Sequence, residues 1–378
     1  MTSVLGCPIS GYDSKWRRAL TPPLDCAMPL PALIGHERVK TRLAGAHASA
    51  KLPQALLFAG PRGAGKQRLA LWLAQLIHCQ APRAVGSNSQ EPCGECRPCR
   101  LVVSLQHPDV HWFVPVELGK RGSDAEKQVD VVAEALAEEM TARREQPLYG
   151  PIAGLASHPV AAVRLLLKRL ALTPAMGTRK VFIVGDAERL NPQLGTEVAA
   201  NALLKALEEP PADSVIILTA ADPNALLPTV LSRVVLVRVA RIADSDVTAF
   251  AQQTLGISSK AELAQRVAAA EGCIGKLFAT APVRPGQSAG ADLAGRFVDA
   301  PWVFALGQVP FQARGGFTDM LDSLASRLRS EARSGGDTDK LVEAIAVVLD
   351  ARDLAQGNVN PQLLAAVLAE DLQAVRGS

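Results

Sequence analysis

Aromatic residues are scarce in this chain of 378 residues, and so is any excess of one charge. Only 4% of the residues are aromatic although 48% are hydrophobic, so Ala, Leu and Val must build the core, which favours helices. The 40 basic residues nearly balance the 37 acidic ones, a formal net charge of +3, which excludes a nucleic-acid binder that works by bulk charge. High apolar content with low net charge also excludes a largely disordered chain.

Long hydrophobic runs are missing too. No run of about 18 uncharged apolar residues occurs, which excludes a membrane span. The amino-terminal segment lacks the apolar stretch of a secretory signal, so we expect a soluble cytoplasmic protein. At about 150 residues per domain, the length predicts two or three domains.

Four of the seven cysteines form a cluster with the spacing C-x13-C-x2-C-x2-C: Cys79, Cys93, Cys96 and Cys99. Four soft thiolates at this spacing predict a closed structural zinc site rather than a catalytic one with an open position. The alternative, free or disulfide-bonded cysteines, is disfavoured because cytoplasmic disulfides are rare. His78 and His107 flank the cluster and are not expected to be ligands. Because the loop has no large apolar residues, the expected role of the metal is stability.

A glycine-rich loop lies between a predicted strand over 54–59 and a predicted helix over 67–78. It reads Gly60-Pro-Arg-Gly63-Ala-Gly65-Lys66-Gln67. In this context the G-x4-G-K spacing predicts a phosphate-binding loop, whose backbone N–H groups hold phosphate oxygens while the lysine reaches the β- and γ-phosphates. The alternative is a glycine-rich turn without function.

Two positions that serve a metal in working phosphate loops are altered here. The residue after Lys66 is normally Ser or Thr, whose hydroxyl ligates Mg²⁺, but this chain has Gln67. A second predicted strand over 180–184 is followed by Gly185 where an Asp that also serves the metal is expected. If the register slips by one residue, Asp186 takes that role instead. We therefore predict poor or absent hydrolysis and leave nucleotide binding open.

These residues resemble a family, the delta-prime subunits of the bacterial DNA polymerase III clamp loader, which are close kin of the gamma/tau subunits. The similarity runs through most of residues 1–285, and the segment 201–211 is highly specific to the family. The segments that carry it are Ile34-Gly-His-Glu37, LPQALLFAGPRGAGK, the cysteine cluster, His107-Pro-Asp109, LALTPAMGTRKVFIVGDAERL, AANALLKALEEPP and ILTAADPNALLPTVLSRV. The resemblance implies an α/β AAA+ P-loop module, a parallel sheet flanked by helices, with a zinc-binding insertion, a small helical lid and a C-terminal all-α collar domain.

The resemblance also assigns roles to single residues. A Ser-Arg pair in the family supplies an arginine finger to the neighbouring subunit's ATP, and the matching residues are Ser232 and Arg233. A guanidinium delivered in trans offsets charge that develops on the transferred phosphoryl group. The residues alone also allow a solvated arginine at a strand end. Val234 follows where the family has Cys, a change of little expected consequence.

Two further positions concern nucleotide sensing. Thr219 matches the sensor-1 position, and Gly275 stands where ATP-hydrolysing relatives have the sensor-2 arginine, with Lys276 a weak substitute. Together with Gln67 and Gly185, this is a third departure in the same direction. It favours the delta-prime type, which gives a finger without hydrolysing ATP, over gamma/tau.

The implied function is to help load the sliding clamp onto primed DNA during replication, in a heteropentamer with gamma/tau and delta subunits. Such a subunit is a component of the DNA polymerase III holoenzyme, a DNA-directed DNA polymerase and nucleotidyltransferase, with no independent ATPase expected. Structural Zn²⁺ is the expected cofactor. The main alternative is a gamma/tau-type ATPase or another AAA+ remodelling enzyme, which requires Ser or Thr at 67, Asp at 185 and Arg at 275. A zinc-dependent nucleic-acid module is a weaker alternative, because basic-aromatic interleaving is lacking around the cysteines.

Domain boundaries follow from composition and from the resemblance. The predicted order is an irregular arm over 1–30, a nucleotide-binding core over 31–240, a helical lid over 241–282, a linker over 283–296 and a helical collar or oligomerisation domain over 297–378. The core contains the cysteine module over 79–99 and a helical insertion over 117–159. Within the insertion, residues 123–145 predict a helix with Ser123 as N-cap and Arg143 and Arg144 at its end. Its interpretation stays open between a solvated appendage and a surface that faces a partner or DNA.

Overall fold

The computed structural model describes residues 30–85, 89–116, 125–147, 156–190, 198–278, 290–307, 314–335, 337–355 and 360–377. The arm predicted over 1–30 lies outside them except for its last residue, and so does the predicted N-cap Ser123. Within the described residues no helix is long and apolar enough to cross a membrane.

Five parallel strands form the central sheet in the order β4-β5-β6-β1-β7. Their bounds are β1 Ala55–Ala59, β4 Val110–Phe113, β5 Lys180–Val184, β6 Ser214–Ala220 and β7 Val235–Arg238. The three central strands are buried along their whole length, as expected for apolar runs covered on both faces of a parallel sheet. The strand predicted over 180–184 has the observed bounds, and the one predicted over 54–59 begins one residue later.

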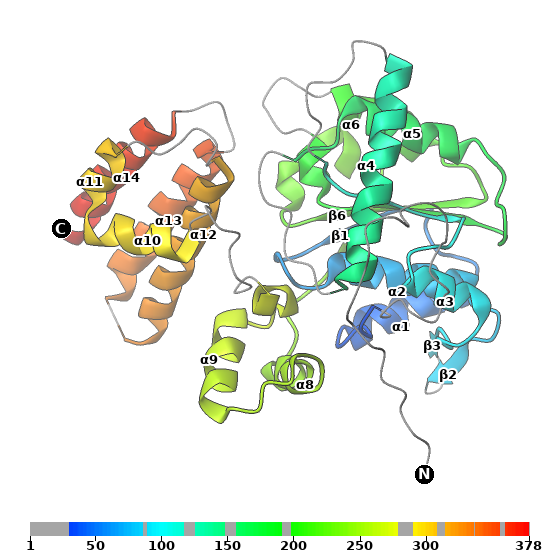
Figure 1. Ribbon diagram of the computed structural model, residues 1–378, viewed down its shortest axis with the longest axis horizontal. Helices are drawn as coiled ribbons and strands as arrows, with labels where there is room; N and C mark the ends of the chain where they lie inside the picture. The colour runs from blue at the N-terminus through cyan, green and yellow to red at the C-terminus, as the bar shows by residue number, and fades with distance from the viewer. Residues whose placement is uncertain are drawn as a thin grey trace, which may run out of the picture.

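Helices cover both faces of the sheet (Figure 1). One face carries α1 Glu37–Ala48, α2 Lys66–His78 and α3 Arg97–Val103, with the small hairpin of β2 Arg83–Val85 and β3 Ser89–Glu91 beside them. The other face carries α5 Val160–Leu170 and α6 Val198–Glu208. Short helical turns, η1 Ala187–Leu190, η2 Pro223–Ala225 and α7 Pro228–Leu231, follow β5 and β6.

The helix of the predicted insertion, α4 Ala125–Glu145, packs on α5. Its apolar stripe, Val129, Val132 and Leu136, is buried in the main hydrophobic core. Near its carboxyl end the Arg143 guanidinium lies 4.3 Å from the centre of the Trp112 ring of β4. This helix is therefore part of the core module rather than a solvated appendage.

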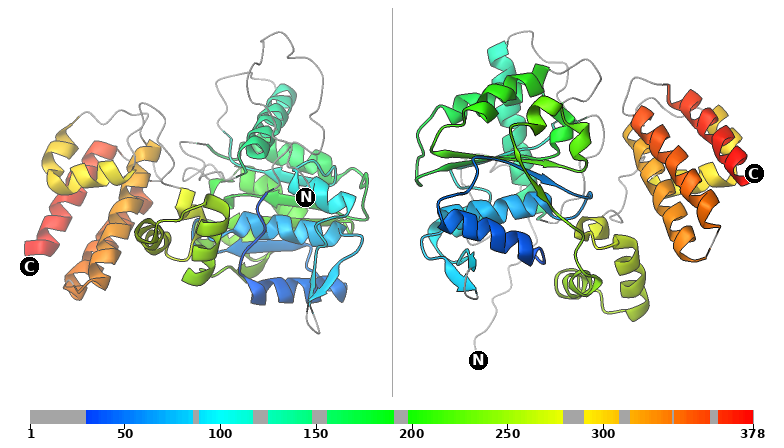
Figure 2. Two further views of the ribbon diagram at one scale, coloured as in Figure 1. Left: turned by 60° about the horizontal axis from the view of Figure 1, so that its bottom comes forward. Right: turned by 180° about the vertical axis from the view of Figure 1, so that it is seen from behind.

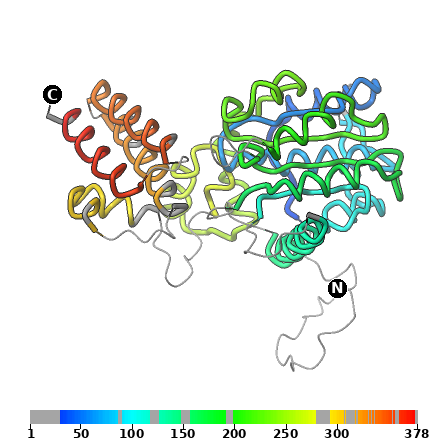
Figure 3. The backbone as a smooth tube through the Cα atoms, turned by 90° about the horizontal axis from the view of Figure 1, so that it is seen from above, coloured from blue at the N-terminus to red at the C-terminus, as the bar shows by residue number. Residues whose placement is uncertain are grey.

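Two helical units follow the sheet. The first contains α8 Asp244–Leu255, α9 Lys260–Ala270 and η3 Ile274–Phe278; the second contains α10 Gly290–Asp299, α11 Pro301–Leu306, α12 Arg314–Arg333, α13 Thr338–Ala355 and α14 Pro361–Gly377. Each has its own cluster of buried apolar side chains, separate from the core around the sheet. Figures 2 and 3 show α8 and α9 between the sheet and the C-terminal bundle. The linker predicted over 283–296 is wrong over 290–296, because α10 begins at Gly290.

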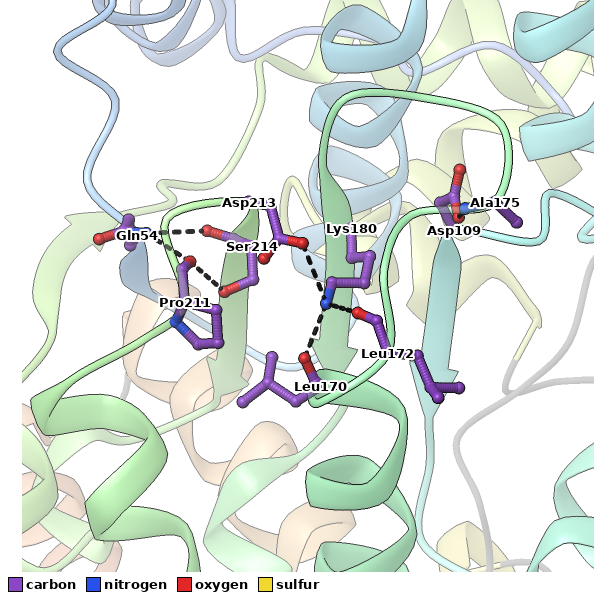
Figure 4. A network of polar contacts seen from close by, with 9 residues as sticks. All are labelled: Gln54, Asp109, Leu170, Leu172, Ala175, Lys180, Pro211, Asp213 and Ser214. Atoms are coloured by element: carbon purple, nitrogen blue, oxygen red, sulfur yellow. Dashed lines mark hydrogen bonds and ion pairs between the residues drawn. The ribbon is translucent and has the colours of Figure 1, made fainter.

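A polar network ties together the amino ends of the strands (Figure 4). The ammonium of Lys180, at the start of β5, is buried; it donates to the carbonyls of Leu170 and Leu172 and pairs with Asp213 at 3.2 Å. Gln54, before β1, donates to the carbonyl of Pro211 at 2.7 Å. These contacts hold the amino ends of the strands in place. The glycine-rich loop lies at the opposite, carboxyl ends of the strands, where β1 ends.

Candidate nucleotide site, arginine finger and cysteine cluster

The glycine-rich loop has the predicted strand, loop and helix context, since it follows β1 and α2 begins at Lys66. Gly63 and Gly65 have left-handed backbone angles, with φ of 79° and 87°, which side chains with a Cβ rarely adopt. His36, from the segment before α1, lies with Nε2 2.8 Å from the Ala64 carbonyl. The glycine-rich loop therefore has the strand, loop and helix context that its spacing predicted, and the His36 side chain contacts it from the segment before α1.

Lys66 is turned onto its own loop. Its ammonium donates to the carbonyls of Gly60 and Pro61 at 2.7 and 2.9 Å. Burial lowers the pKa of Lys66 below its usual value, although the Glu188 and Asp186 carboxylates act in the opposite direction. A phosphate group would have to replace these two carbonyl acceptors.

The two positions predicted to have lost metal ligands, 67 and 185, lie against each other. Gln67, in the first turn of α2, packs on Gly185, which directly follows β5. The Gly185 N–H still donates to the Phe113 carbonyl at 2.8 Å, so Gly185 continues the pairing of β5 with β4. Position 185 is thus the residue at the strand end, as predicted, and its lack of a side chain makes room for the glutamine amide.

Asp186 turns away from the strand in a left-handed conformation with φ of 50°. Its N–H donates to the Thr219 hydroxyl at 3.1 Å, so the structure brings together the predicted sensor-1 residue and the end of β5. Asp186 remains close enough for its charge to act on the pKa of Lys66.

Two further residues near the loop, the half-buried Glu188 and the buried His158, were not among the predicted site residues. The Glu188 carboxylate accepts from the Ala221 N–H at 3.2 Å, and burial, with Asp186 adding to it, raises the pKa of Glu188. His158 lies with Nε2 2.7 Å from the Gly185 carbonyl, and burial lowers the pKa of His158 to about 4. The sequence could have indicated Glu188, because an acidic residue soon after a buried strand is typical of this kind of site. Nothing in the sequence around His158 indicates its contact with the Gly185 carbonyl.

The helical unit of α8, α9 and η3 contacts the glycine-rich loop through backbone atoms. The Gly275 N–H donates to the Gly63 carbonyl at 2.9 Å, and a Cβ at Gly275 would lie only 2.6 Å from the Gly63 Cα. Lys276 instead pairs with Glu271 at 2.5 Å within its own unit. At the predicted sensor-2 position a glycine therefore contacts the glycine-rich loop, and the neighbouring Lys276 pairs with Glu271.

Ser232 and Arg233 lie at the amino ends of the strands, just before β7 begins at Val235. Because β7 runs parallel to β1 and each strand residue advances about 3.3 Å, Arg233 lies about 20 Å from the chain's own phosphate loop. Its side chain is 31% exposed and pairs with Glu208. Arg233 is therefore available at the surface and out of reach of the chain's own loop.

The four clustered cysteines converge as predicted. Their Sγ atoms all lie within 4.8 Å of one another, and the pair Cys93 and Cys99 is 4.0 Å apart. Sulfurs at the corners of a tetrahedral zinc site, each about 2.3 Å from the metal, are separated by roughly the same distance, so the donor set fits zinc. Backbone N–H groups of Cys93 and Cys96 point at the sulfurs of Cys79 and Cys93, both at 3.3 Å.

The environment of the cluster favours the thiolate at Cys93 only, because burial raises the pKa of Cys79 and of Cys99. Hydrogen bonds from the N–H groups of Cys96 and Glu95 lower the pKa of Cys93 to about 6. Cys79 caps the carboxyl end of α2, a helix of 13 residues, which places the cluster about 20 Å from the phosphate loop. A metal held there is too distant to take part in phosphate chemistry.

The histidines that flank the cysteines belong to a different cluster. The rings of His78 and His107 lie against each other with centroids 4.1 Å apart and planes tilted by 37°. Among the described residues the group that can hold a metal contains only the four cysteines. Asp109 accepts hydrogen bonds from the N–H groups of three consecutive residues, Ala175, Met176 and Gly177. The segment His107-Pro-Asp109 thus holds a loop in place.

Comparison with known proteins identifies the family of the chain. A family model described as DNA polymerase III, delta subunit, matches residues 35–243, more than half of the chain. The chain belongs to this family. A DNA polymerase III subunit delta′ of Pseudomonas aeruginosa is 36% identical over 182 residues, which are 48% of this chain and 41% of that protein. The delta′ subunit of Bacillus subtilis is 31% identical over 183 residues, with the same coverage of each chain.

Members of a neighbouring group match as well. A DNA polymerase III subunit gamma/tau of Mycobacterium bovis is 32% identical over 203 residues, which are 53% of this chain and 27% of that protein. The chain thus spans less than half the length of these relatives. Among solved structures, a DNA polymerase III gamma subunit-related protein from Thermotoga maritima is 18% identical with a TM-score of 0.40, over 89% of this chain and all of that one.

Proposed function

We propose that the chain is a delta-prime-type subunit of a DNA polymerase III clamp loader, which helps place the sliding clamp on primed DNA during replication. Membership of the DNA polymerase III delta subunit family over residues 35–243 supports this proposal, as do the relatives named delta′. The partners are gamma/tau-type and delta-type subunits in a heteropentamer, together with the clamp and primed DNA.

One observation carries the proposal: Arg233 lies at the amino ends of the strands, and the chain's own phosphate loop lies at their carboxyl ends. The two positions that would bind Mg²⁺ beside that loop hold Gln67 and Gly185 instead. An arginine about 20 Å from the loop of its own chain can act only on a nucleotide held by another chain. Gln67 and Gly185, packed together, leave no hydroxyl or carboxylate at the two positions that ligate Mg²⁺ in a hydrolysing subunit. The chain therefore acts on a neighbour's ATP without turning over its own.

The architecture follows the same proposal. Residues 31–240 form the AAA+ module, with the cysteine module over 79–99 and the insertion over 117–159 built into it. Residues 241–282 form the lid, and the bundle that begins at Gly290 forms the collar through which subunits assemble. The four cysteines hold a structural Zn²⁺ that supplies fixed geometry to a hairpin and helix with little core of their own.

The test is the ATPase rate of a loader reconstituted from gamma/tau-type and delta-type subunits, with and without this chain. We expect the rate with clamp and primed DNA to rise when the chain is added, and Arg233→Ala to remove most of that rise while assembly, measured by gel filtration, is unchanged. Arg266→Ala is the matched control, because Arg266 pairs with Glu262 on the surface of α9. Equal rates with wild type and Arg233→Ala would reject Arg233 as the finger.

The alternative, a gamma/tau-type ATPase, is tested on the purified chain alone. The 32% identity to a gamma/tau subunit favours it, while Gln67, Gly185 and Gly275 oppose it. Brisk DNA-stimulated hydrolysis by the isolated chain would reverse the order of the two functions.

A further inference from the structure

Arg233 is held by a single carboxylate. Glu208 Oε1 accepts from Arg233 Nε at 2.8 Å and pairs with Arg233 Nη2 at 2.5 Å, so one oxygen binds one whole edge of the guanidinium. The remaining nitrogen, Nη1, donates to the Thr229 carbonyl at 2.8 Å and to the Ser232 hydroxyl at 3.1 Å. The orientation of the arginine is therefore determined by contacts within its own chain.

The two edges of the guanidinium differ in the strength of their contacts. The Nε edge meets an ionised acceptor, and charge-assisted hydrogen bonds are about twice as strong as neutral ones. The Nη1 side meets a carbonyl and a hydroxyl, both neutral. A phosphate oxygen of a neighbouring subunit can replace the neutral acceptors with a gain in free energy, whereas replacing Glu208 exchanges one anion for another. The Glu208 contact is thus the one that persists when the arginine engages a phosphate.

The location of Glu208 strengthens this reading. It is the last residue of α6, and Pro210 and Pro211 follow shortly after, which prevents the helix from continuing. A carboxylate at a helix carboxyl end is disfavoured by the helix dipole, so Arg233 offsets a charge that is otherwise unfavourable there. The two residues are 25 apart in the chain and meet where α6 contacts α7.

We propose that Glu208 is a positioning residue for the arginine finger: it holds the Nε edge of Arg233 so that the Nη1 side faces the nucleotide of the neighbouring subunit. This inference rests on the proposed function, in which Arg233 acts on a neighbour's ATP. Glu208 itself touches no substrate and acts only through Arg233. Removing it lets the arginine sample other rotamers, which lowers the fraction of time that the finger is in place.

The test uses the full chain in the reconstituted loader, with ATP hydrolysis measured in the presence of clamp and primed DNA. We expect Glu208→Ala to lower kcat by about threefold to tenfold, the scale of a partly exposed ion pair that becomes enclosed at an interface, with KM for ATP unchanged. Glu208→Gln keeps an oxygen acceptor and is expected to recover part of the loss. Glu209→Ala is the control, because Glu209 is an exposed neighbour of the same charge.

A double variant separates positioning from a general structural role. If Glu208 acts through Arg233, then Glu208→Ala has no further effect on kcat in a chain that already carries Arg233→Ala. An effect of equal size in both backgrounds, or a faster rate for Glu208→Ala alone, overturns the inference. If Arg233→Ala itself leaves the rate unchanged, the proposed function of the arginine fails instead. The melting temperatures of all variants verify that each one is folded.

Discussion

The side-chain amide of Gln67 packs directly on Gly185: a Cβ atom at residue 185 would lie 2.7 Å from Gln67 Nε2. Both positions are predicted to have lost metal ligands, and the missing side chain at Gly185 makes room for the Gln67 amide. A glutamine at 67 fills the space that a carboxylate at 185 would need. The two changes are therefore coupled by direct contact in this fold.

Restoring one of these positions alone is expected to destabilise the protein. Gly185→Asp forces a buried amide to move and brings a third carboxylate near Asp186 and Glu188, for a loss of about 1–3 kcal/mol in the free energy of unfolding. Adding Gln67→Ser removes the steric conflict, so the double variant is expected to lose less than the sum of the two single variants. Denaturant unfolding of all three measures the difference.

Gly45→Ala is the matched control, because a Cβ at Gly45 on α1 meets nothing within 4 Å. Alanine is a better helix former than glycine, so this variant is expected to be neutral or more stable by up to about 1 kcal/mol. Strict additivity of the changes at 67 and 185 would contradict the coupling inferred between the two side chains.

Nucleotide binding by the isolated chain is expected to be weak. Lys66 is satisfied by two loop carbonyls, and Gly275 lies against Gly63, so a phosphate must displace contacts that are already made. With a dissociation constant of about 1 mM or more, ATP and Mg²⁺ at about 1 mM raise the melting temperature by less than about 1 °C. Thermal unfolding with and without nucleotide measures this. A rise of several degrees would mean that Lys66 leaves the carbonyls of Gly60 and Pro61 for a phosphate.

Much of this arrangement could be predicted from local pattern. The strand at 180–184, the loop at 60–66 and the cysteine cluster each follow from a short run of residues whose chemistry is self-contained. Contacts between distant segments could not be predicted in this way. The pairing of Glu208 with Arg233, and of Gln67 with Gly185, depends on how the sheet brings together segments that no periodicity connects.

The predicted start of the C-terminal bundle was wrong for a related reason. The stretch before Phe297 contains Pro282, Pro285 and three glycines, a composition that favours a linker, yet α10 begins at Gly290. Phe297 and Ala294 are buried against the bundle, and this burial outweighs the low helix propensity of the glycines. The strands β2 and β3 have three residues each, which is too short for an alternation of apolar and polar residues to reveal them.

Removal of zinc is expected to unfold the cysteine module without unfolding the sheet. Metal analysis should give about one Zn per chain, and a strong chelator should expose 83–97 to proteases, because the β2–β3 hairpin has little apolar contact of its own. A Cys93→Ser variant is expected to be cleaved there even without chelator. Protein that carries no zinc after careful preparation, or a cleavage pattern insensitive to chelator, would reject the zinc site.

Asp109 is expected to be important for stability although it lies far from the phosphate loop. Burial disfavours its charge, but the N–H groups of Ala175, Gly177 and Met176 more than offset this effect, and the pKa of Asp109 lies below its usual value. Asp109→Asn removes the charge and directs N–H donors at N–H donors, for an expected loss of about 2–4 kcal/mol. Chemical unfolding measures the loss. Asp222→Asn serves as the control, since Asp222 caps the exposed turn η2 and Asn caps equally well.

The stability of the protein is expected to fall with acid in a way that His158 accounts for in part. In the folded chain burial lowers the pKa of His158 to about 4, against an ordinary value near 6.5, so between these pH values the unfolded chain binds the extra proton. The free energy of unfolding therefore decreases as pH falls from 6.5 towards 4, by about 3 kcal/mol in total from this residue. Asp186 and Arg189 are the charged neighbours that act on it, with opposite signs.

His158→Gln tests this assignment, because glutamine can still donate to the Gly185 carbonyl but does not titrate. Whatever its stability at pH 7, the variant is expected to lose about 3 kcal/mol less than wild type between pH 7 and pH 4. Denaturant unfolding at a series of pH values measures both curves, and His47→Gln, at a half-buried site on α1, is expected to change the slope much less. Parallel curves for wild type and His158→Gln would mean that His158 is already accessible to protons in the folded chain, and that its burial beneath Gly185 is not maintained in solution.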